Sequence, residues 1–165
     1  MFERQKRRLV GLFGSAAQTA PNPNRRTVAE WLGYPADARL LVIHSDDFGM
    51  NRSVNRAIAQ ALEQGWINSA SIMVPCPGFA EAALWAKAHP ESDLGIHLTL
   101  NAEWTAYRWG PVSDQPAGSK LRDAEGYLPK DKKYVRQADP RDVEAEVRAQ
   151  VERALAAGVK PSHLD

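Results

Sequence analysis

A short run of large aliphatic residues, soon followed by two acids, most limits what this chain can fold into. Residues 40–43 read Leu-Leu-Val-Ile without interruption, and Asp46 and Asp47 follow within the next four positions. Such a run is typical of a strand covered on both faces, as in a parallel sheet. Adjacent carboxylates after a buried strand are costly unless their charge is used, and a divalent metal is the usual partner. The run therefore predicts a parallel sheet with a charged site at its edge.

The rest of the chain repeats this strand unit with helices between the strands. Patterns of apolar and turn residues predict further strands at 69–74, 93–100 and 160–165, and helices at 51–64, 79–89 and from Asp139 to Gly158. Alternating strands and helices imply parallel strands joined by right-handed crossovers. The predicted fold class is α/β, with active groups at the carboxyl ends of the strands. Four candidates lie at or near such ends: Asp46, Asp47, His97 and Asp165.

Aliphatic residues alternate with other residues along the predicted third strand, and this pattern indicates which side chains share a face. Even-numbered positions from Leu94 to Leu100 are aliphatic, whereas the odd positions carry Gly95, His97 and Thr99. Successive side chains of a strand point to opposite faces. We therefore expect helices to cover the aliphatic face and His97 to point toward a polar central space.

The segment before the fourth strand has two parts. Residues 101–138 lack strong periodicity and form a long excursion, and such loops are often functional. In the helix that follows, a buried stripe is expected at Val143, Val147, Val151 and Leu155.

Composition excludes several classes of protein. The formal net charge is +1, and the one basic block covers residues 4–8. A nucleic-acid-binding protein needs a basic face to meet phosphates, so this class is not favoured. The single cysteine, Cys76, excludes an internal disulfide framework, and no apolar run is long enough for a transmembrane helix.

The amino terminus reads as a leader over residues 1–26. A basic block, a short apolar run at 9–14 and small residues at 16–20 have the order of a signal peptide, although two glycines interrupt the apolar run. Export and a cytoplasmic location therefore both stay open. Thr27, Glu30 and Gly33 then predict a short helix with a capping box and a glycine stop.

Each site candidate also has a simpler structural interpretation. Asp46 and Asp47 could be an ordinary helix-start pair, and His97 could be a packed core histidine. Asp47-Phe48-Gly49 matches the kinase magnesium triplet, but the glycine-rich loop and other kinase motifs are absent. His44 is expected to be a packed or supporting group and His89 a structural one, while the role of His163 stays open.

Two further features carry weaker signals. Cys76 lies between two prolines with no evident base partner, so thiol catalysis is not favoured. Trp104, Tyr107, Arg108 and Trp109 follow the third strand and fit either a hydrophobic plug or a platform for a sugar ring.

Together these stretches resemble the YdjC-like carbohydrate deacetylase family. The matching residues cover most of 38–165 in order. They are the runs Val42 to Met50, Val54-Asn55, Ser69 to Pro75, Gly95 to Leu100, and Pro161 to Asp165. Each run alone is weak, but the set is specific.

The resemblance implies a distorted (β/α) barrel, a divalent metal such as magnesium or zinc, and removal of N-acetyl groups from an amino sugar or oligosaccharide. It implies that Asp47 and His97 bind the metal and that Asp46 is the general base. Beside what the resemblance implies, the sequence offers His44, His163 and Asp165 as candidate supporting groups around this centre. Trp104, Tyr107, Arg108 and Trp109 are the candidate contacts to the sugar.

The resemblance also predicts a partial barrel. Residues 27–165 correspond to the amino-terminal part of the domain, truncated after the start of strand 4. A further histidine ligand of the family lies beyond Asp165, so impaired activity is expected. Uncovered sheet edges favour association, so a homo-oligomer is a candidate state. Two other functions stay open: a non-catalytic carbohydrate-binding or assembly module, and a metal-dependent phosphate-ester hydrolase.

Overall fold

The computed structural model describes residues 26–165, which belong to two compact units divided after Leu41. The first unit contains α2 (Val28–Trp31). The hydroxyl of Thr27 accepts a hydrogen bond from Glu30 N, and the Glu30 carboxylate accepts one from Thr27 N. The predicted capping box is therefore confirmed, and Gly33 follows the helix with φ of 83°. The predicted leader lies outside the described residues, except for Arg26.

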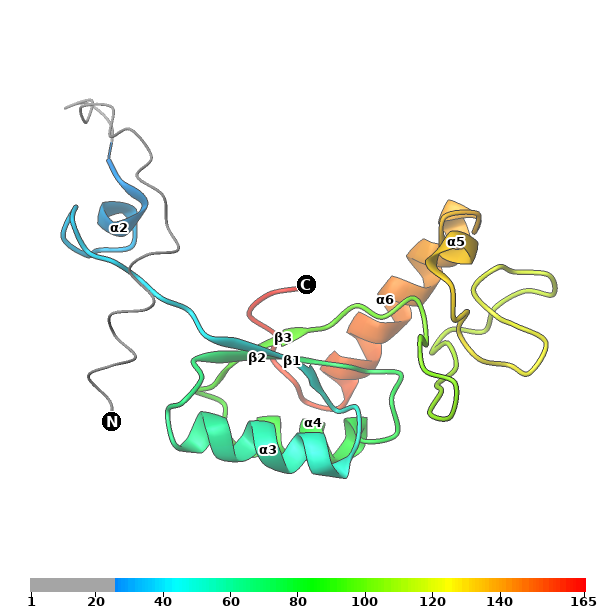
Figure 1. The fold of residues 1–165 in the computed structure, drawn as a ribbon, viewed down its shortest axis with the longest axis horizontal. Coiled ribbons are helices and arrows are strands. Elements are labelled where there is room, and N and C mark those ends of the chain that lie inside the picture. The colour runs from blue at the N-terminus through cyan, green and yellow to red at the C-terminus, as the bar shows by residue number, and fades with distance from the viewer. Residues whose placement is uncertain (1–25) are drawn as a thin grey trace. The chain divides into compact units, whose positions relative to one another are not determined.

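The second unit is built on a parallel sheet (Figure 1). Its strands are β1 (His44–Phe48), β2 (Ser69–Ile72) and β3 (Asp93–Ile96), in that spatial order. The last residues of the chain run parallel to β3, because Asp165 N donates to Ile96 O at 3.1 Å and Leu98 N donates to Asp165 O at 3.0 Å. The predicted α/β class with parallel strands is confirmed.

Two helices cover one face of this sheet. α3 (Arg52–Glu63) and α4 (Phe79–Ala88) lie side by side beneath the strands in Figure 1. Asn51 caps α3 by accepting from the backbone N–H groups of residues 53 and 54. The main core lies between sheet and helices, and it includes Phe48, Ile58, Ile72, Phe79 and Ile96.

The aliphatic run at 40–43 does not form the buried strand that its sequence predicts. The strand begins at His44, and residues 40–43 are 45–77% exposed. β1 is an edge strand of the described sheet, and α3 packs against it. A strand does form in this part of the chain, but it contains the two acids and does not end before them, so the predicted bounds and burial were wrong.

The predicted buried stripe of the last helix is only partly confirmed. α6 (Pro140–Ala156) begins after its cap, Asp139. Val143, Val147 and Val151 are half-buried, and Val143 and Val151 pack against the two cores. The fully buried residues are instead Glu146, Gln150 and Ala154, and Leu155 is 52% exposed. The Glu146 carboxylate accepts from Val112 N, Ser113 N and the Ser113 hydroxyl at 2.7–2.9 Å. A polar face is buried because the irregular chain packed on it has backbone donors that need acceptors.

The long excursion between β3 and α6 has a small core of its own. It contains the short helix α5 (Lys132–Val135) and otherwise no helix or strand over residues 101–138. Its side chains at Trp109, Leu121 and Leu128 pack with Met50 and Met73, which follow β1 and β2. The excursion is therefore anchored at the carboxyl ends of the strands. Within residues 26–165, no helix has the length and apolarity needed to cross a membrane.

We expect Glu146→Ala to lower the free energy of unfolding by about 3 kcal/mol, because it leaves buried donors at residues 112 and 113 without an acceptor. Urea denaturation would measure this. Glu144→Ala on the same helix removes only an exposed ion pair with Arg148, so its change should stay within about 0.5 kcal/mol. Equal effects of the two changes would contradict the anchoring role of Glu146.

Candidate functional site

One face of the sheet is polar and carries most of the sequence-predicted site residues. Residues such as Ile72 and Ile96 point into the helix-covered core, so their neighbours along each strand point the other way. The predicted assignment of the two faces of β3 is confirmed for Leu94 through Leu98. The opposite face brings together side chains from the strands and from the end of the chain: His44, Asp46, Ser69, Ser71, His97, His163 and Asp165.

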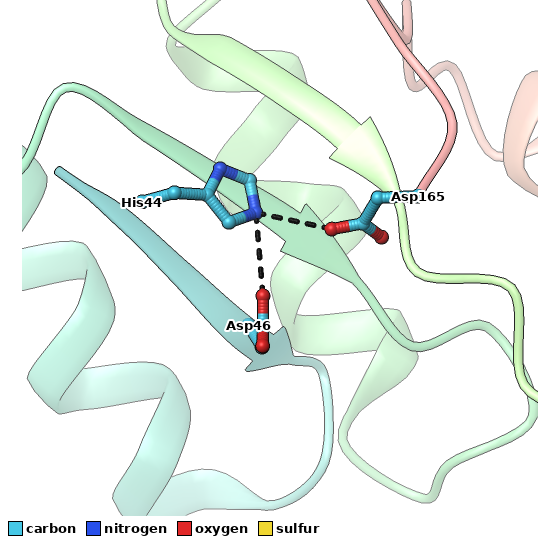
Figure 2. A group of neighbouring side chains, drawn as sticks. All are labelled: His44, Asp46 and Asp165. Carbon is cyan, nitrogen blue, oxygen red and sulfur yellow. Dashed lines mark ion pairs between the residues drawn. The ribbon is translucent and has the colours of Figure 1, made fainter. Parts of the chain in front are cut away.

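His44 lies between two carboxylates on this face (Figure 2). Its Nε2 atom is 3.5 Å from Asp46 Oδ1 and 3.3 Å from Asp165 Oδ2. The ring is held by the hydroxyls of Ser69 and Ser71, at 2.9 and 3.1 Å. One donor atom from each of His44, Asp46 and Asp165 falls within 4.8 Å of the others. An imidazole and two carboxylates are a suitable donor set for a divalent cation.

The side-chain carboxylate of Asp165 also contacts His97. Its Nδ1 atom is 2.9 Å from Asp165 Oδ1, and its Nε2 atom is 3.7 Å from Asp47 Oδ1. A histidine that ligates a metal usually has its other ring nitrogen hydrogen-bonded to a carboxylate or carbonyl group. His97 has this arrangement, with Nε2 on the side of Asp47. The structure therefore brings together the two residues that the resemblance implies as metal ligands.

Asp47 has an unusual backbone conformation. Its φ is 70°, the only positive value for a non-glycine residue among the described residues, and Gly49 follows with φ of 97°. The turn is held by Asn55 on α3, whose side-chain oxygen accepts from Gly49 N at 2.7 Å and whose nitrogen donates to Gly78 O at 3.0 Å. Left-handed backbone at a non-glycine residue costs free energy, and it is common at functional sites.

Sequence reasoning missed the role of Asn55, although a signal was present. It is a polar residue next to Val54 on a helix face that also carries Ile58, and it is 3% exposed. A buried amide in an apolar stripe needs specific partners. Ser69 and Ser71 were missed as well, because nothing in the sequence marks them as neighbours of His44.

The pKa values of two carboxyl groups at the site, Asp47 and Asp165, are shifted in opposite directions. Burial raises the pKa of Asp47, and the charges of Asp46, Glu103 and Asp165 raise it further, against a smaller lowering by His97. Burial also acts to raise the pKa of Asp165, but hydrogen bonds from His97 and Ser71 outweigh it, so this pKa is lowered. Crowded negative charge around Asp47 is an environment that favours a bound cation.

The two other histidines have separate surroundings. The His163 ring meets that of His44 edge to face at 5.4 Å and occupies the space where a Cβ on Gly95 would lie. His89 stacks on Trp85 and hydrogen-bonds the Trp85 carbonyl, which confirms its structural role at the end of α4.

The aromatic segment after β3 divides into packed and open side chains. Trp109 is 3% exposed and donates to Asn101 O, and the Tyr107 hydroxyl donates to Met50 O. Arg108 is bound by Asp123 and Glu125. The plug interpretation therefore applies to Tyr107 and Trp109, and the platform interpretation fails for Trp109 because its ring is covered. Trp104 is 50% exposed and keeps a ring face available.

Cys76 is packed against Met73 in the smaller core. Burial raises the pKa of its thiol to about 12, and the charge of Asp47 adds to the effect. Because the thiolate is the nucleophile, this environment is unsuited to thiol catalysis.

An α/β protein with carboxylates and imidazoles gathered at the ends of parallel strands has a recognisable counterpart among known families. The YdjC-like protein family matches residues 40–165, and the chain belongs to this family. It is 39% identical over 126 residues to a carbohydrate deacetylase of Brevibacillus brevis, covering 76% of this chain and 47% of that protein. A carbohydrate deacetylase of Thermus thermophilus is 38% identical over 128 residues, which cover 77% of this chain and 43% of that protein.

The fold has a similar solved counterpart. A crystal structure of an Enterococcus faecalis V583 protein, named for cellobiose-phosphate cleavage, superposes with a TM-score of 0.63 and 26% identity. The match covers 75% of this chain and 46% of that one. This chain thus spans about half the length of the curated relatives it matches.

We expect Asn55→Ala to lower the free energy of unfolding by about 2 kcal/mol, because Gly49 N and Gly78 O lose a buried partner. It should also broaden the amide NMR signals of residues 46–50 as their turn loosens. Gln60→Ala, at an exposed position of the same helix, is the matched control and should do neither. Unchanged signals at 46–50 in the Asn55 variant would show that this residue does not hold the turn.

Proposed function

We propose that this chain carries the chemistry of a metal-dependent hydrolase that removes acetyl groups from acetylated amino sugars or their oligosaccharides. The observation that carries the proposal is the placement of Asp46, Asp47 and His97 near the carboxyl ends of β1 and β3, with Asp47 and His97 3.7 Å apart, in a chain of the YdjC-like family. Its relatives named carbohydrate deacetylases support the choice of substrate class. The wider architecture would be part of a (β/α) barrel.

The proposed metal ligands are Asp47 and His97. Their nearest ligand atoms are 3.7 Å apart, and the carboxylate–imidazole pair is compatible with zinc or magnesium. Asp165 orients the His97 ring through Nδ1 and leaves Nε2 for the cation. When bound, a divalent cation would polarise the amide carbonyl and lower the pKa of a coordinated water.

Asp46 is the proposed general base. Its carboxylate precedes Asp47 directly and is 62% exposed, so that a water molecule can reach it. It would accept a proton as the water oxygen attacks the acetyl carbon, and it would return that proton to the nitrogen as the C–N bond breaks. Acetate and a free amino group on the sugar are the products.

A second assignment of the metal ligands follows from the geometry around His44. The set of His44, Asp46 and Asp165 also holds three donor atoms close together. In that arrangement Asp46 would be a ligand and could not also be a free base. The Asp47–His97 assignment is preferred because it leaves Asp46 available for proton transfer and because Asp47 is the more buried of the two adjacent acids.

Calorimetric titration of zinc into the full chain separates the two assignments. We expect Asp47→Ala and His97→Ala to abolish binding and His44→Ala to weaken it without abolishing it, because Ser69 and Ser71 hold the His44 ring as a supporting group. His89→Ala is the control histidine, remote in its contacts, and should bind as the original does. Binding that survives in the Asp47 variant but is lost in the His44 variant would favour the second set.

We expect the full chain loaded with metal to release acetate from N-acetylglucosamine oligomers, and Asp46→Asn to lower kcat by roughly 10²-fold or more, as is typical for loss of a general base. Zinc affinity should be retained in this variant. Acetate assay and titration on the same samples measure both quantities. If Asp46→Asn loses zinc binding together with activity, the base assignment is wrong.

Two alternatives make different predictions. A non-catalytic carbohydrate-binding or assembly module, with or without self-association, would bind oligosaccharide without releasing acetate at any metal concentration. A phosphate-ester hydrolase would release phosphate from p-nitrophenyl phosphate. The acetate and phosphate assays together discriminate among the three functions.

A further inference from the structure

Ser71 on β2 lies between the two histidines of the polar face. Its Oγ atom is 3.1 Å from His44 Nε2 and 3.4 Å from His97 Nδ1. The same hydroxyl hydrogen-bonds the carboxylate of Asp165. Ser71 is 0% exposed, so its hydroxyl has to find its partners within the protein. One buried hydroxyl group is therefore shared among two imidazoles and one carboxylate.

The number of protons on this hydroxyl limits how the hydrogen bonds can run. A serine hydroxyl donates one proton and accepts through two lone pairs. An ionised carboxylate only accepts, so the His97 Nδ1 atom that lies 2.9 Å from Asp165 Oδ1 carries a proton and donates it. Toward that N–H group the oxygen of Ser71 can only accept. The proton of Ser71 is left for Asp165 or for His44 Nε2.

Both of these arrangements have the same consequence for His44. If Ser71 donates to His44 Nε2, the lone pair of that nitrogen is used. If Ser71 donates to Asp165, the hydrogen bond at 3.1 Å needs its proton from His44, and Nε2 carries that proton. A cation binds an imidazole only through a free lone pair. Figure 2 shows this same nitrogen facing Asp46 and Asp165.

The Nε2 atom of His97 is in a different situation. Because Nδ1 of this ring donates to Asp165, the lone pair of the neutral ring is on Nε2. In the part of the chain that the structure describes, no hydrogen bond reaches this nitrogen, and Asp47 Oδ1 lies 3.7 Å from it. Of the two imidazoles, only His97 therefore has an Nε2 lone pair free for a cation.

We propose that Ser71 is a positioning residue that keeps the cation on His97 and away from His44, because its hydroxyl occupies the Nε2 atom of His44. Asp46 thereby stays outside the coordination sphere and remains available as the base. This inference rests on the proposed function, because it takes Asp47 and His97 as the metal ligands.

Calorimetric titration of zinc into variants of the full chain tests this role by a gain of binding. The proposed ligand pair predicts that His97→Ala alone does not bind. Adding Ser71→Ala frees the Nε2 atom of His44, which then becomes a third donor beside Asp46 and Asp165. We expect the double variant to bind zinc at least about tenfold more tightly than His97→Ala, the scale typical of groups that hold a ligand in place. A further His44→Ala should remove the gained binding. A merely structural role of Ser71 would not create binding.

Ser69→Ala combined with His97→Ala is the matched control. Ser69 lies two residues before Ser71 on the same strand, and its hydroxyl is 2.9 Å from the other ring nitrogen of His44, Nδ1. Both carboxylates lie at Nε2, so freeing Nδ1 adds no donor to their set. This control should bind zinc no better than His97→Ala does.

A measurement on the unsubstituted chain complements the variants, because Ser71 is buried. With isotope-labelled histidine and an NMR-active cadmium isotope, a coupling between metal and ring nitrogen should appear at His97 and not at His44. A coupling at His44 would overturn the inference. Thermal unfolding without metal checks that each variant is folded.

The outcomes separate this inference from the proposed function. No gain of zinc binding on adding Ser71→Ala, or an equal gain in the Ser69 control, would overturn the role of Ser71 even if acetate is released. Zinc binding by His97→Ala with Ser71 in place would also overturn it. The expected pattern of binding without any release of acetate would support Ser71 as the positioning residue and contradict the proposed reaction.

Discussion

The carboxylate of Asp165 joins the parts of the site that lie far apart in the sequence. One of its oxygens meets His97 beyond β3, and the other meets His44 at the start of β1. The backbone of the same residue pairs with Ile96 and Leu98, so the carboxylate is placed by the sheet and not by a flexible loop. Because one rigid acid contacts both imidazoles, the orientations of the two rings are coupled. The proposed chemistry depends on that coupling, since it requires His97 Nε2 to face Asp47.

The excursion depends on a different polar network. The Glu146 carboxylate on α6 accepts hydrogen bonds from Val112 N and Ser113 N. The Gln150 side chain accepts one from Thr99 N and donates one to Thr99 O. A long segment without regular structure has many backbone donors and acceptors, and buried ones require partners. The helix provides these partners from side chains that a hydrophobic pattern would place in solvent. These contacts fix the excursion to α6 at Thr99, Val112 and Ser113 despite its irregular chain.

The order and type of the main elements could be predicted from the sequence because local signals coincide. The capping box at Thr27, the glycines after helices and the alternation along β3 all agree with the structure. The exposure of residues 40–43 and the buried face of α6 could not be predicted in this way. Both depend on which part of the chain packs against the segment in question. This is a property of tertiary packing, and the spacing of apolar residues in the sequence does not encode it. Likewise, Asp46, Asp47 and His97 could be selected as site residues from their places on strands, whereas the serines and Asn55 that hold the site became evident only from contacts.

The setting of Cys76 has a practical consequence for studying this protein. It is the only cysteine in the sequence, it is 3% exposed, and its thiol stays protonated at neutral pH. Alkylating and maleimide reagents require an accessible thiolate. A cysteine introduced at an exposed position would therefore be the single reactive thiol of the folded chain. Spectroscopic labels could then be attached at chosen exposed positions without first removing the native residue.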